Sequence, residues 1–137
     1  MNFVPAKLMR GSLELGTVRL ELPHEVRTRL VHEPENVLAG FRPEAFHDAQ
    51  LAKANGGPSL HADVEVTEQL GPETIAYVRV GGVQTIELGE RPVELGGALA
   101  VRLDPRTHAR PGGPVDLAIA VDQVHLFEAA TGETLLR

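Results

Sequence analysis

Cysteine is absent from this sequence of 137 residues. Disulfide bonds and thiolate metal sites are therefore excluded, and the composition suits a reducing compartment. Tryptophan is absent too, and aromatic residues make up only 4% of the chain, so rings on which bases or sugars could stack are scarce. The hydrophobic core has to be built mainly from Val, Leu, Ile and Ala.

Long apolar runs are also missing. No stretch approaches the roughly 20 apolar residues that a membrane-spanning helix needs, and residues 1–5 lack the charged and apolar regions of a secretion signal. We therefore expect a soluble chain. Its 42% apolar content is enough for one core in a chain of this length, so we expect a single domain over residues 1–137.

Positive charge is scarce. The formal net charge is −6, and the lysines are Lys7 and Lys53. Proteins that bind a nucleic acid backbone use clustered Lys and Arg side chains, which displace counterions. The charge balance therefore argues against nucleic acid as a partner, and only salt-sensitive binding to single strands would revive that function.

The sequence does contain many runs in which apolar and polar residues alternate, as they do in half-buried strands. Runs on either side of Gly16-Thr17 predict a first hairpin, at 13–15 and 18–22. A second hairpin is predicted at 63–70 and 75–80, joined by the turn-rich residues 71–74. Further strands are expected at 37–41, 85–88, 98–103, 115–121 and 124–127.

The strand expected at 63–70 contains one conflict. Alternation places Val64, Val66 and Leu70 on the buried face, and Glu68 with them. A buried carboxylate without a partner is costly, so either a bulge turns Glu68 outward or a buried hydrogen bond satisfies it. We expect the bulge.

Helical character is confined to residues 43–55, with Asp48 as a candidate N-cap and Gly56 as a stop. Residues 52–59 are expected to form a mobile loop. The fold class predicted from the whole pattern is all-β with a minor helix. We expect a closed or nearly closed OB-fold-like β-barrel with additional strands, because closure removes exposed sheet edges.

The sequence offers little support for catalysis. The six histidines never pair at the spacing that would place two imidazoles on one helical face, so no metal site is predicted. The segment 57–61, which contains Ser59, lacks the second glycine of a nucleophile elbow. Asp63 and Glu65 are expected on a solvent face, and His125 is expected to be hydrogen-bonded at a strand end. We therefore predict no catalytic, cofactor-binding or metal-binding residue.

Four short segments stand in a fixed order. They are residues 1–5 (Met-Asn-Phe-Val-Pro), 40–44 (Gly-Phe-Arg-Pro-Glu), 68–74 (Glu-Gln-Leu-Gly-Pro-Glu-Thr), and 125–127 (His-Leu-Phe) with 131–132 (Thr-Gly). In this order and spacing they resemble the C-terminal regulatory (TOBE-type, OB-fold) domain of the ATP-binding subunits of maltose-type sugar ABC importers. Each motif is weak alone, but together they span most of the chain.

The resemblance implies an OB-fold that follows the ATPase domain in each of two identical subunits. In that family the domain helps to hold the ATPase homodimer together, and in some members it receives regulatory proteins. The matching positions in this sequence are expected to stabilise bends rather than to bind partners. They are Gly40, Arg42, Pro43, Glu44, Glu68, Gly71, Glu73, His125, Phe127 and Gly132.

The ATPase half of that family is missing from this sequence. No glycine-framed loop followed by Lys and Ser or Thr occurs, so nucleotide binding within the chain has no support. We expect an excised domain that is not itself an enzyme and holds no cofactor, whereas the parent ATPase would use ATP and magnesium. The resemblance implies a cytoplasmic location, peripheral at the inner membrane face through the transporter's membrane subunits, and it does not identify the sugar.

A second function class is a barrel that binds a small oxyanion or solute. Capturing an oxyanion needs convergent backbone amides or arginine side chains. Arg102, Arg106 and Arg110 lie near Gly112-Gly113 and could supply them, although a solvated basic loop is the simpler interpretation. Saturable binding of molybdate, sulfate or a sugar would favour this class over a regulatory domain.

Overall fold

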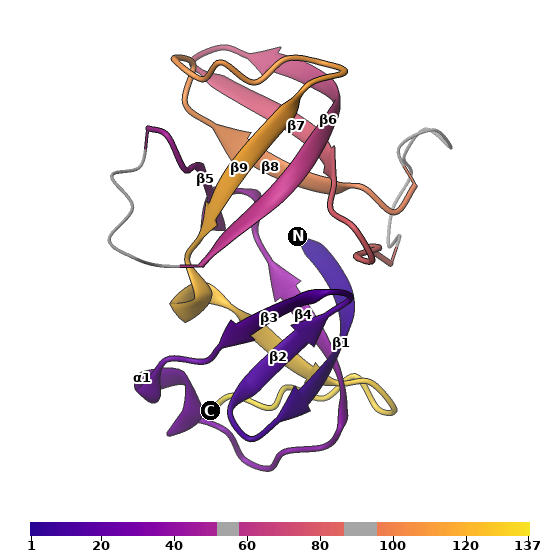
Figure 1. The fold of residues 1–137 in the computed structure, drawn as a ribbon. Coiled ribbons are helices and arrows are strands. Elements are labelled where there is room, and N and C mark those ends of the chain that lie inside the picture. The colour runs from indigo at the N-terminus through magenta and orange to yellow at the C-terminus, as the bar shows by residue number, and fades with distance from the viewer. Residues whose placement is uncertain (52–57, 87–95) are drawn as a thin grey trace.

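The computed structural model describes residues 1–51, 58–86 and 96–137. Two antiparallel five-stranded sheets make up most of it, which confirms the all-β expectation (Figure 1). Most of the expected mobile loop (52–57) and the end of the expected strand at 85–88 (87–88) lie outside the described residues.

The first sheet has the strand order β10-β4-β1-β2-β3. Its strands are β1 (Asn2–Met9), β2 (Ser12–Leu15), β3 (Val18–Glu21), β4 (Asn36–Phe41) and β10 (His125–Glu128). Leu15 pairs with Val18 across the two-residue turn, so the first predicted hairpin is confirmed. Leu13, Leu15 and Leu20 are buried, as their alternation requires.

The second sheet has the order β5-β9-β6-β7-β8. Its strands are β5 (Phe46–Asp48), β6 (Ser59–Leu70), β7 (Glu73–Arg79), β8 (Leu99–Leu103) and β9 (Pro114–Ile119). The second predicted hairpin is therefore also present, although Leu70 pairs directly with Glu73 and the turn is shorter than expected. The strand expected at 115–121 ends at Ile119, because Val121 begins the 3-10 turn η3 (Val121–Gln123).

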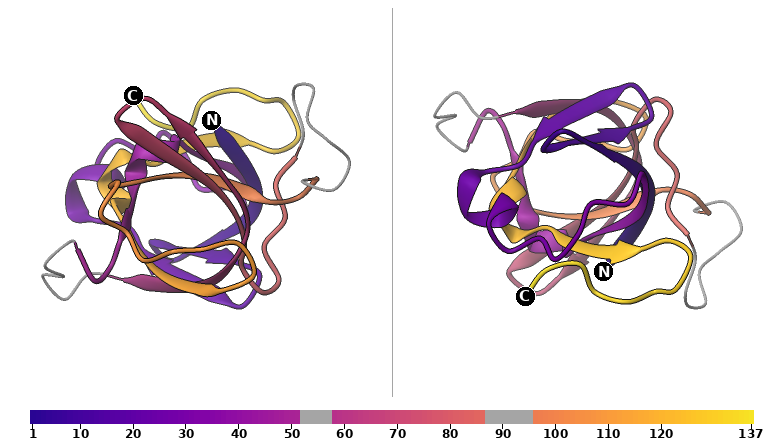
Figure 2. Two further views of the ribbon diagram at one scale, coloured as in Figure 1. Left: turned by 90° about the horizontal axis from the view of Figure 1, so that it is seen from above. Right: turned by 90° about the horizontal axis from the view of Figure 1, so that it is seen from below.

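The two sheets lie one above the other in Figure 1, and their strands surround a common interior when viewed from either end (Figure 2). One continuous cluster of buried apolar side chains fills that interior, with contributions from both sheets. The rings of Phe41 and Phe46 meet within it, with centroids 5.8 Å apart. The predicted OB-fold-like barrel is thus a single nearly closed body with one core.

Polar contacts also join the two sheets. The Asn2 side-chain amide donates to the carbonyls of Phe41 (3.1 Å) and Ala100 (2.8 Å), and its oxygen accepts from the Ala100 amide (2.7 Å). The Ile86 amide donates to the Phe3 carbonyl at 2.7 Å. Because Asn2 is only 2% exposed, its bonds are largely shielded from water, and the two with Ala100 help to fix the relative position of the sheets.

The prediction of a helix at 43–55 is wrong over its described part, residues 43–51. Residues 43–45 form a single 3-10 turn, η1 (Pro43–Ala45), and the chain continues directly as strand β5. Phe46 pairs with Ile119 of β9, so tertiary pairing overrides the weak local helical signal. The short helix that does form, α1 (His24–Arg27), lies elsewhere and buries Val26.

Asp48 is not a helix N-cap either. Its carboxylate is buried, accepting one hydrogen bond from the Gln50 amide at 2.9 Å and another from the Thr107 hydroxyl. Through Thr107, Asp48 fixes the loop that precedes β9.

The bulge expected in the second hairpin exists, but it lies three residues before Glu68. The pairing of β6 with β7 shifts between Val64 and Val66, which leaves Glu65 as the extra residue. The inward and outward faces exchange there, so Glu68 is exposed. The same exchange leaves Val66 39% and Leu70 56% exposed, so placing these two side chains on the buried face was wrong.

Candidate functional site

Residues 42–44 carry the chain from the first sheet to the second. Strand β4 ends at Phe41, Arg42 is extended (φ −72, ψ 152), and Pro43 is the first residue of η1. Proline fixes φ near the helical value, so it favours this abrupt change of direction. The Ala45 amide closes the turn on the Arg42 carbonyl at 2.9 Å. The turn therefore sets where the Arg42 and Glu44 side chains emerge.

Gly40 lies where the two ends of the chain meet. It pairs with Phe3 on one side and with His125 of β10 on the other. A Cβ at this position would lie 2.7 Å from the Met1 sulfur and 3.5 Å from the Phe127 ring. Phe127 in turn contacts Phe3, with ring centroids 6.0 Å apart. Gly40 therefore provides the space in which the N-terminal strand and β10 pack together.

The structure separates the motif residues into groups. Gly40, Arg42, Pro43, Glu44, His125 and Phe127 gather around the end of β4. Glu68, Gly71 and Glu73 lie on the β6–β7 hairpin of the other sheet, where Gly71 has φ +64. Gly132, with φ +77, lies in the turn that follows β10.

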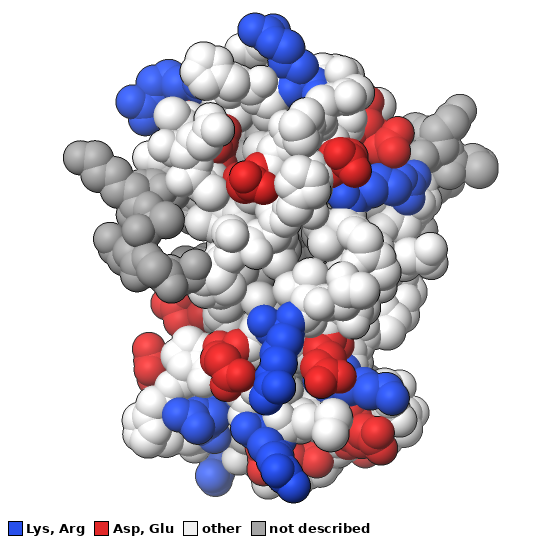
Figure 3. All heavy atoms as spheres, viewed as in Figure 1, with Lys and Arg blue, Asp and Glu red and all other residues white. Residues whose placement is uncertain are grey.

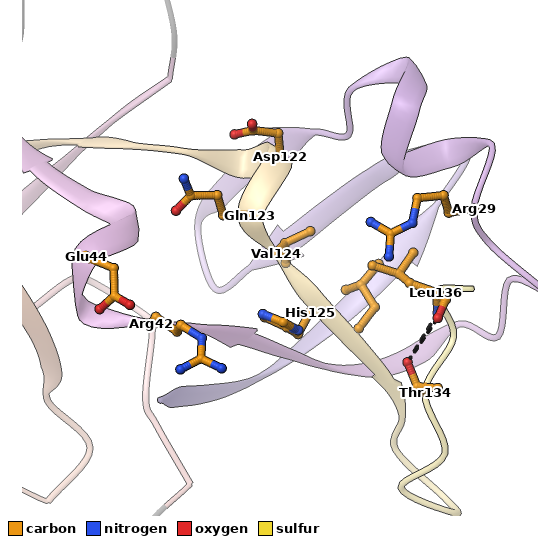
Figure 4. A pocket seen from close by; sticks show the side chains of 10 residues that line it. Arg29, Arg42, Glu44, Asp122, Gln123, Val124, His125, Thr134 and Leu136 are labelled. Carbon is orange, nitrogen blue, oxygen red and sulfur yellow. Dashed lines mark hydrogen bonds between the residues drawn. The ribbon is translucent and has the colours of Figure 1, made fainter.

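A cleft of about 430 Å³ opens beside the first group. Arg42, Glu44 and His125 line it, together with side chains that come from two other parts of the chain. Figure 4 shows how these side chains surround the cleft. The additional polar lining residues are Arg29, Asp122, Gln123 and Thr134.

Arg29 reaches the cleft through the return of the chain after β10, whereas η3 directly precedes β10 and is held beside the 43–45 turn by the Ala120 amide, which donates to the Ala45 carbonyl at 2.8 Å. The chain after β10 runs back along that strand, with the Leu135 amide donating to the Leu126 carbonyl at 2.8 Å. It then meets residues 29–31, where the Arg29 Nε donates to the Arg137 carbonyl at 2.7 Å. No local sequence pattern marks Arg29 or Asp122 as site residues, because contacts between segments far apart in the sequence bring both of them beside Arg42.

The cleft has two walls of different chemistry. The Arg42 guanidinium, the His125 imidazole and the Arg29 guanidinium form one row, and Glu44, Gln123 and Asp122 form a second row beside it (Figure 4). Neither Arg42 nor His125 makes a side-chain hydrogen bond or ion pair with any residue in 1–51, 58–86 or 96–137. The hydrogen-bonded histidine expected at 125 is therefore wrong, because this side chain faces the open cleft.

The cleft offers polar contacts rather than a reactive centre. Within the described ranges, no group of three or more His, Cys, Asp or Glu side chains could hold a metal ion. The lining has no serine or cysteine to serve as a nucleophile. The cleft can bind and orient a polar group.

The family model described as MalK OB fold domain matches residues 1–46, which include β1 to β4 and the turn at Pro43. The chain carries an OB-fold domain of the MalK type. This MalK-type domain is 31% identical, over 98% of its length, to the trehalose/maltose import ATP-binding protein MalK of Thermococcus litoralis. It is 32% identical, over 94% of its length, to the sn-glycerol-3-phosphate import ATP-binding protein UgpC of Chromohalobacter salexigens.

The MalK-type domain spans about a third of the length of these relatives, 34% of the Thermococcus protein and 30% of the Chromohalobacter protein. Among solved structures, the cytoplasmic molybdate-binding protein ModG has the same type of fold, with a TM-score of 0.62. The superposition covers 91% of this chain and 94% of that one at 12% identity, so the likeness concerns the fold.

The MalK-type domain does not assemble the arginine cluster considered from the sequence. Arg102 contacts the Glu73 carboxylate at 2.6 Å, and Arg106 contacts Asp104 at 3.0 Å. Hydrogen bonds from Arg106 hold the pKa of Asp104 below its ordinary value, and Asp104 raises the pKa of Arg106 in return. Two of the three guanidiniums are thus already paired with carboxylates.

The remaining surface of the MalK-type domain carries both signs of charge. On the face shown in Figure 3, acidic and basic side chains alternate over the lower part of the molecule. Opposite charges so close together largely cancel at a distance. In the described ranges, no helix is long and apolar enough to cross a membrane.

Proposed function

We propose that this chain is the regulatory domain of the ATP-binding subunit of a carbohydrate ABC importer, and that it acts by self-association. One observation carries the proposal: the similarity to import ATP-binding proteins extends over 98% of the chain. In this proposal the ATPase domain of the parent subunit binds ATP and magnesium and contacts the membrane subunits. The location is then cytoplasmic, at the inner face of the membrane.

The architecture suits a tether. A tether has to keep its shape under load, and here one core and the buried Asn2 bonds join both sheets into one body. A domain that holds two subunits together needs a lasting contact surface and no reactive group. The polar lining of the cleft agrees with that role.

Self-association would act through effective concentration. When the two nucleotide-binding halves separate, a contact between their regulatory domains keeps them close enough to meet again, because the second encounter is intramolecular. A regulatory protein that docked on this domain could change how readily the halves meet. The domain would thus control transport without taking part in ATP hydrolysis.

The assignment to an ATP-binding subunit is tested on the gene and on the intact subunit. The reading frame upstream of Met1 should encode a phosphate-binding loop in frame. Deleting the region equivalent to residues 1–137 from the intact subunit should weaken ATP-dependent transport and leave ATP binding unchanged. An upstream frame without such a loop, or a deletion that leaves transport intact, would reject the proposal.

The alternative, an oxyanion-binding barrel that uses the arginines near Gly112-Gly113, has less support. Arg102 and Arg106 already hold carboxylates, so an incoming oxyanion would have to displace them. Titration with molybdate, sulfate and common sugars distinguishes the two functions. Tight, saturable binding that is lost on changing Arg110 would favour the alternative.

A further inference from the structure

We propose that the cleft beside Arg42 binds a small anion that carries hydroxyl groups, such as a phosphate monoester or a sugar acid. The inference is independent of self-association, because it concerns a separate concave surface and a small-molecule ligand. It follows from the charges, the unpaired groups and the size of the cleft.

The first step concerns Arg42, whose charge has no partner in the described structure. Some other exposed arginines do have one: Arg19 contacts Glu21 at 3.4 Å, and Arg79 contacts Glu65 at 3.3 Å. Glu44 is only two residues from Arg42 and lines the same cleft, yet the two side chains form no ion pair, and in Figure 4 they stand in neighbouring rows. A permanently charged fork that remains unpaired in a concave site is suited to binding an external oxyanion.

The second step is that other donors share the wall of Arg42. His125 lies next to it in the row, and Arg29 follows (Figure 4). The bond from Arg29 to the Arg137 carbonyl uses Nε, which holds the side chain in place and leaves the terminal nitrogens to donate. Two guanidiniums and an imidazole on one wall can surround a phosphate or a carboxylate from several directions.

The third step concerns the neighbouring wall, whose chemistry indicates what the rest of the ligand must carry. Glu44 and Asp122 present carboxylates, which accept hydrogen bonds, and Gln123 presents an amide. These carboxylates would repel a second negative charge but would accept hydrogen bonds from hydroxyl groups. The two walls therefore match a molecule with an anionic group at one end and hydroxyls at the other.

Size and the floor of the cleft support the same class of ligand. A volume of about 430 Å³ lies in the range of small-molecule sites, and a bare phosphate or sulfate ion would leave most of it empty. Leu136 also lines the cleft and is half-buried, so it presents an apolar surface. A short carbon chain that links the anion to the hydroxyls can lie over it.

The test is an equilibrium titration of the 137-residue chain by calorimetry. The probes are glycerol 3-phosphate and gluconate as hydroxylated anions, inorganic phosphate as the bare anion, and glycerol as the uncharged polyol. We expect saturable one-to-one binding of at least one hydroxylated anion. Binding of inorganic phosphate and of glycerol should be at least about tenfold weaker, because each satisfies one wall only.

Two variants that each remove one positive charge, at different places, test where the ligand binds. Arg42→Gln should weaken binding of the hydroxylated anion by about tenfold or more, since a charge-assisted hydrogen bond is lost. Arg110→Gln, on an exposed loop of the other sheet, should leave the affinity unchanged. Arg42→Lys, which keeps the charge but not the fork, should fall between Arg42→Gln and the unaltered protein. A thermal melt of each variant confirms that it is folded.

Three results would overturn the inference. One is the absence of saturable binding by both hydroxylated anions up to about 10 mM. Another is an affinity that Arg42→Gln leaves unchanged. The third is inorganic phosphate binding as tightly as glycerol 3-phosphate, which would show that the Glu44 and Asp122 wall contributes nothing to recognition.

Discussion

At the scale of single residues, the Asn2 side chain makes three hydrogen bonds, of which two reach Ala100 in the other sheet and one holds Phe41 in its own sheet. Asn2→Ala would remove these bonds and leave two carbonyls and one amide without their partner. We expect a loss of about 3 kcal/mol in the free energy of unfolding, measured by urea denaturation. Asn36→Ala, at an exposed position of β4, is the control and should change it by less than about 0.5 kcal/mol. Equal effects of the two changes would disprove the bridging role of Asn2.

Gly16 and Gly71 both have positive φ, but their surroundings differ. A Cβ at Gly16 would collide with the Gly82 carbonyl, whereas nothing lies within 4 Å of one at Gly71. Gly71→Ala should therefore lower the free energy of unfolding by only about 1 kcal/mol, the cost of placing alanine in the left-handed conformation. Gly16→Ala should cost clearly more, about 3 kcal/mol or above, because the hairpin turn would have to move away from Gly82. A Gly16→Ala variant that melts at the same temperature as Gly71→Ala would contradict this close approach.

Asp104 and Arg106 form an exposed pair whose effect on pH dependence has a definite sign. Because Arg106 lowers the pKa of the folded-state Asp104 carboxyl, the pair contributes stability above the ordinary pKa of an aspartate. That contribution disappears as the pH falls through the lowered value, and solvent screening keeps it small. A carboxyl NMR titration should find Asp104 titrating below its ordinary range, and Arg106→Gln should move its pKa upward. An unchanged titration in the variant would rule out the pairing.

At the scale of elements, the bulge at Glu65 decides which side of β6 faces the core. Val64 lies before the bulge and is 2% exposed, whereas Val66 lies after it and is 39% exposed. Val64→Thr should cost about 1–3 kcal/mol, since it buries a hydroxyl without a partner. Val66→Thr, the same chemical change two residues on, should cost less than about 0.5 kcal/mol. Denaturant unfolding of both variants checks the order, and a reversed order would place the bulge elsewhere.

The same strand shows how far the sequence predicts the elements. Regular alternation would turn the Glu68 side chain inward, which indicates that the strand contains a bulge. Alternation alone does not locate the bulge, because an extra residue anywhere between Val64 and Glu68 would turn that carboxylate outward. Residues 43–55 show the opposite limit. Their helical signal is local, whereas the pairing of Phe46 with Ile119 joins segments more than 70 residues apart and overrides it.

Only part of the candidate cleft could be predicted from the sequence. The motif at 40–44 and the segment at 125–127 mark one wall, because their residues recur together in the family that the sequence resembles. Arg29 and Asp122 belong to no motif. Arg29 lies outside every predicted strand, and Asp122 directly follows the strand predicted at 115–121. The place of Arg29 depends on the chain returning along β10 and pairing with residues 29–31, and the place of Asp122 beside Arg42 depends on the bond between Ala120 and Ala45. These long-range contacts leave no periodic trace in the sequence.

At the scale of the whole molecule, one core extends through both sheets, and the buried Asn2 side chain makes two hydrogen bonds across them. A body of this kind is expected to unfold as one unit and to transmit force between its surfaces without deforming. Those properties suit the proposed role of holding two ATP-binding subunits together. They also agree with the proposed ligand binding in the cleft, which would require no change in the barrel.

Self-association is the central claim, and sedimentation equilibrium of the 137-residue chain tests it most directly. Over a roughly hundredfold range of protein concentration, the weight-average mass should rise reversibly from that of one chain towards that of two. A mass that stays at one chain throughout the range would contradict the proposed function.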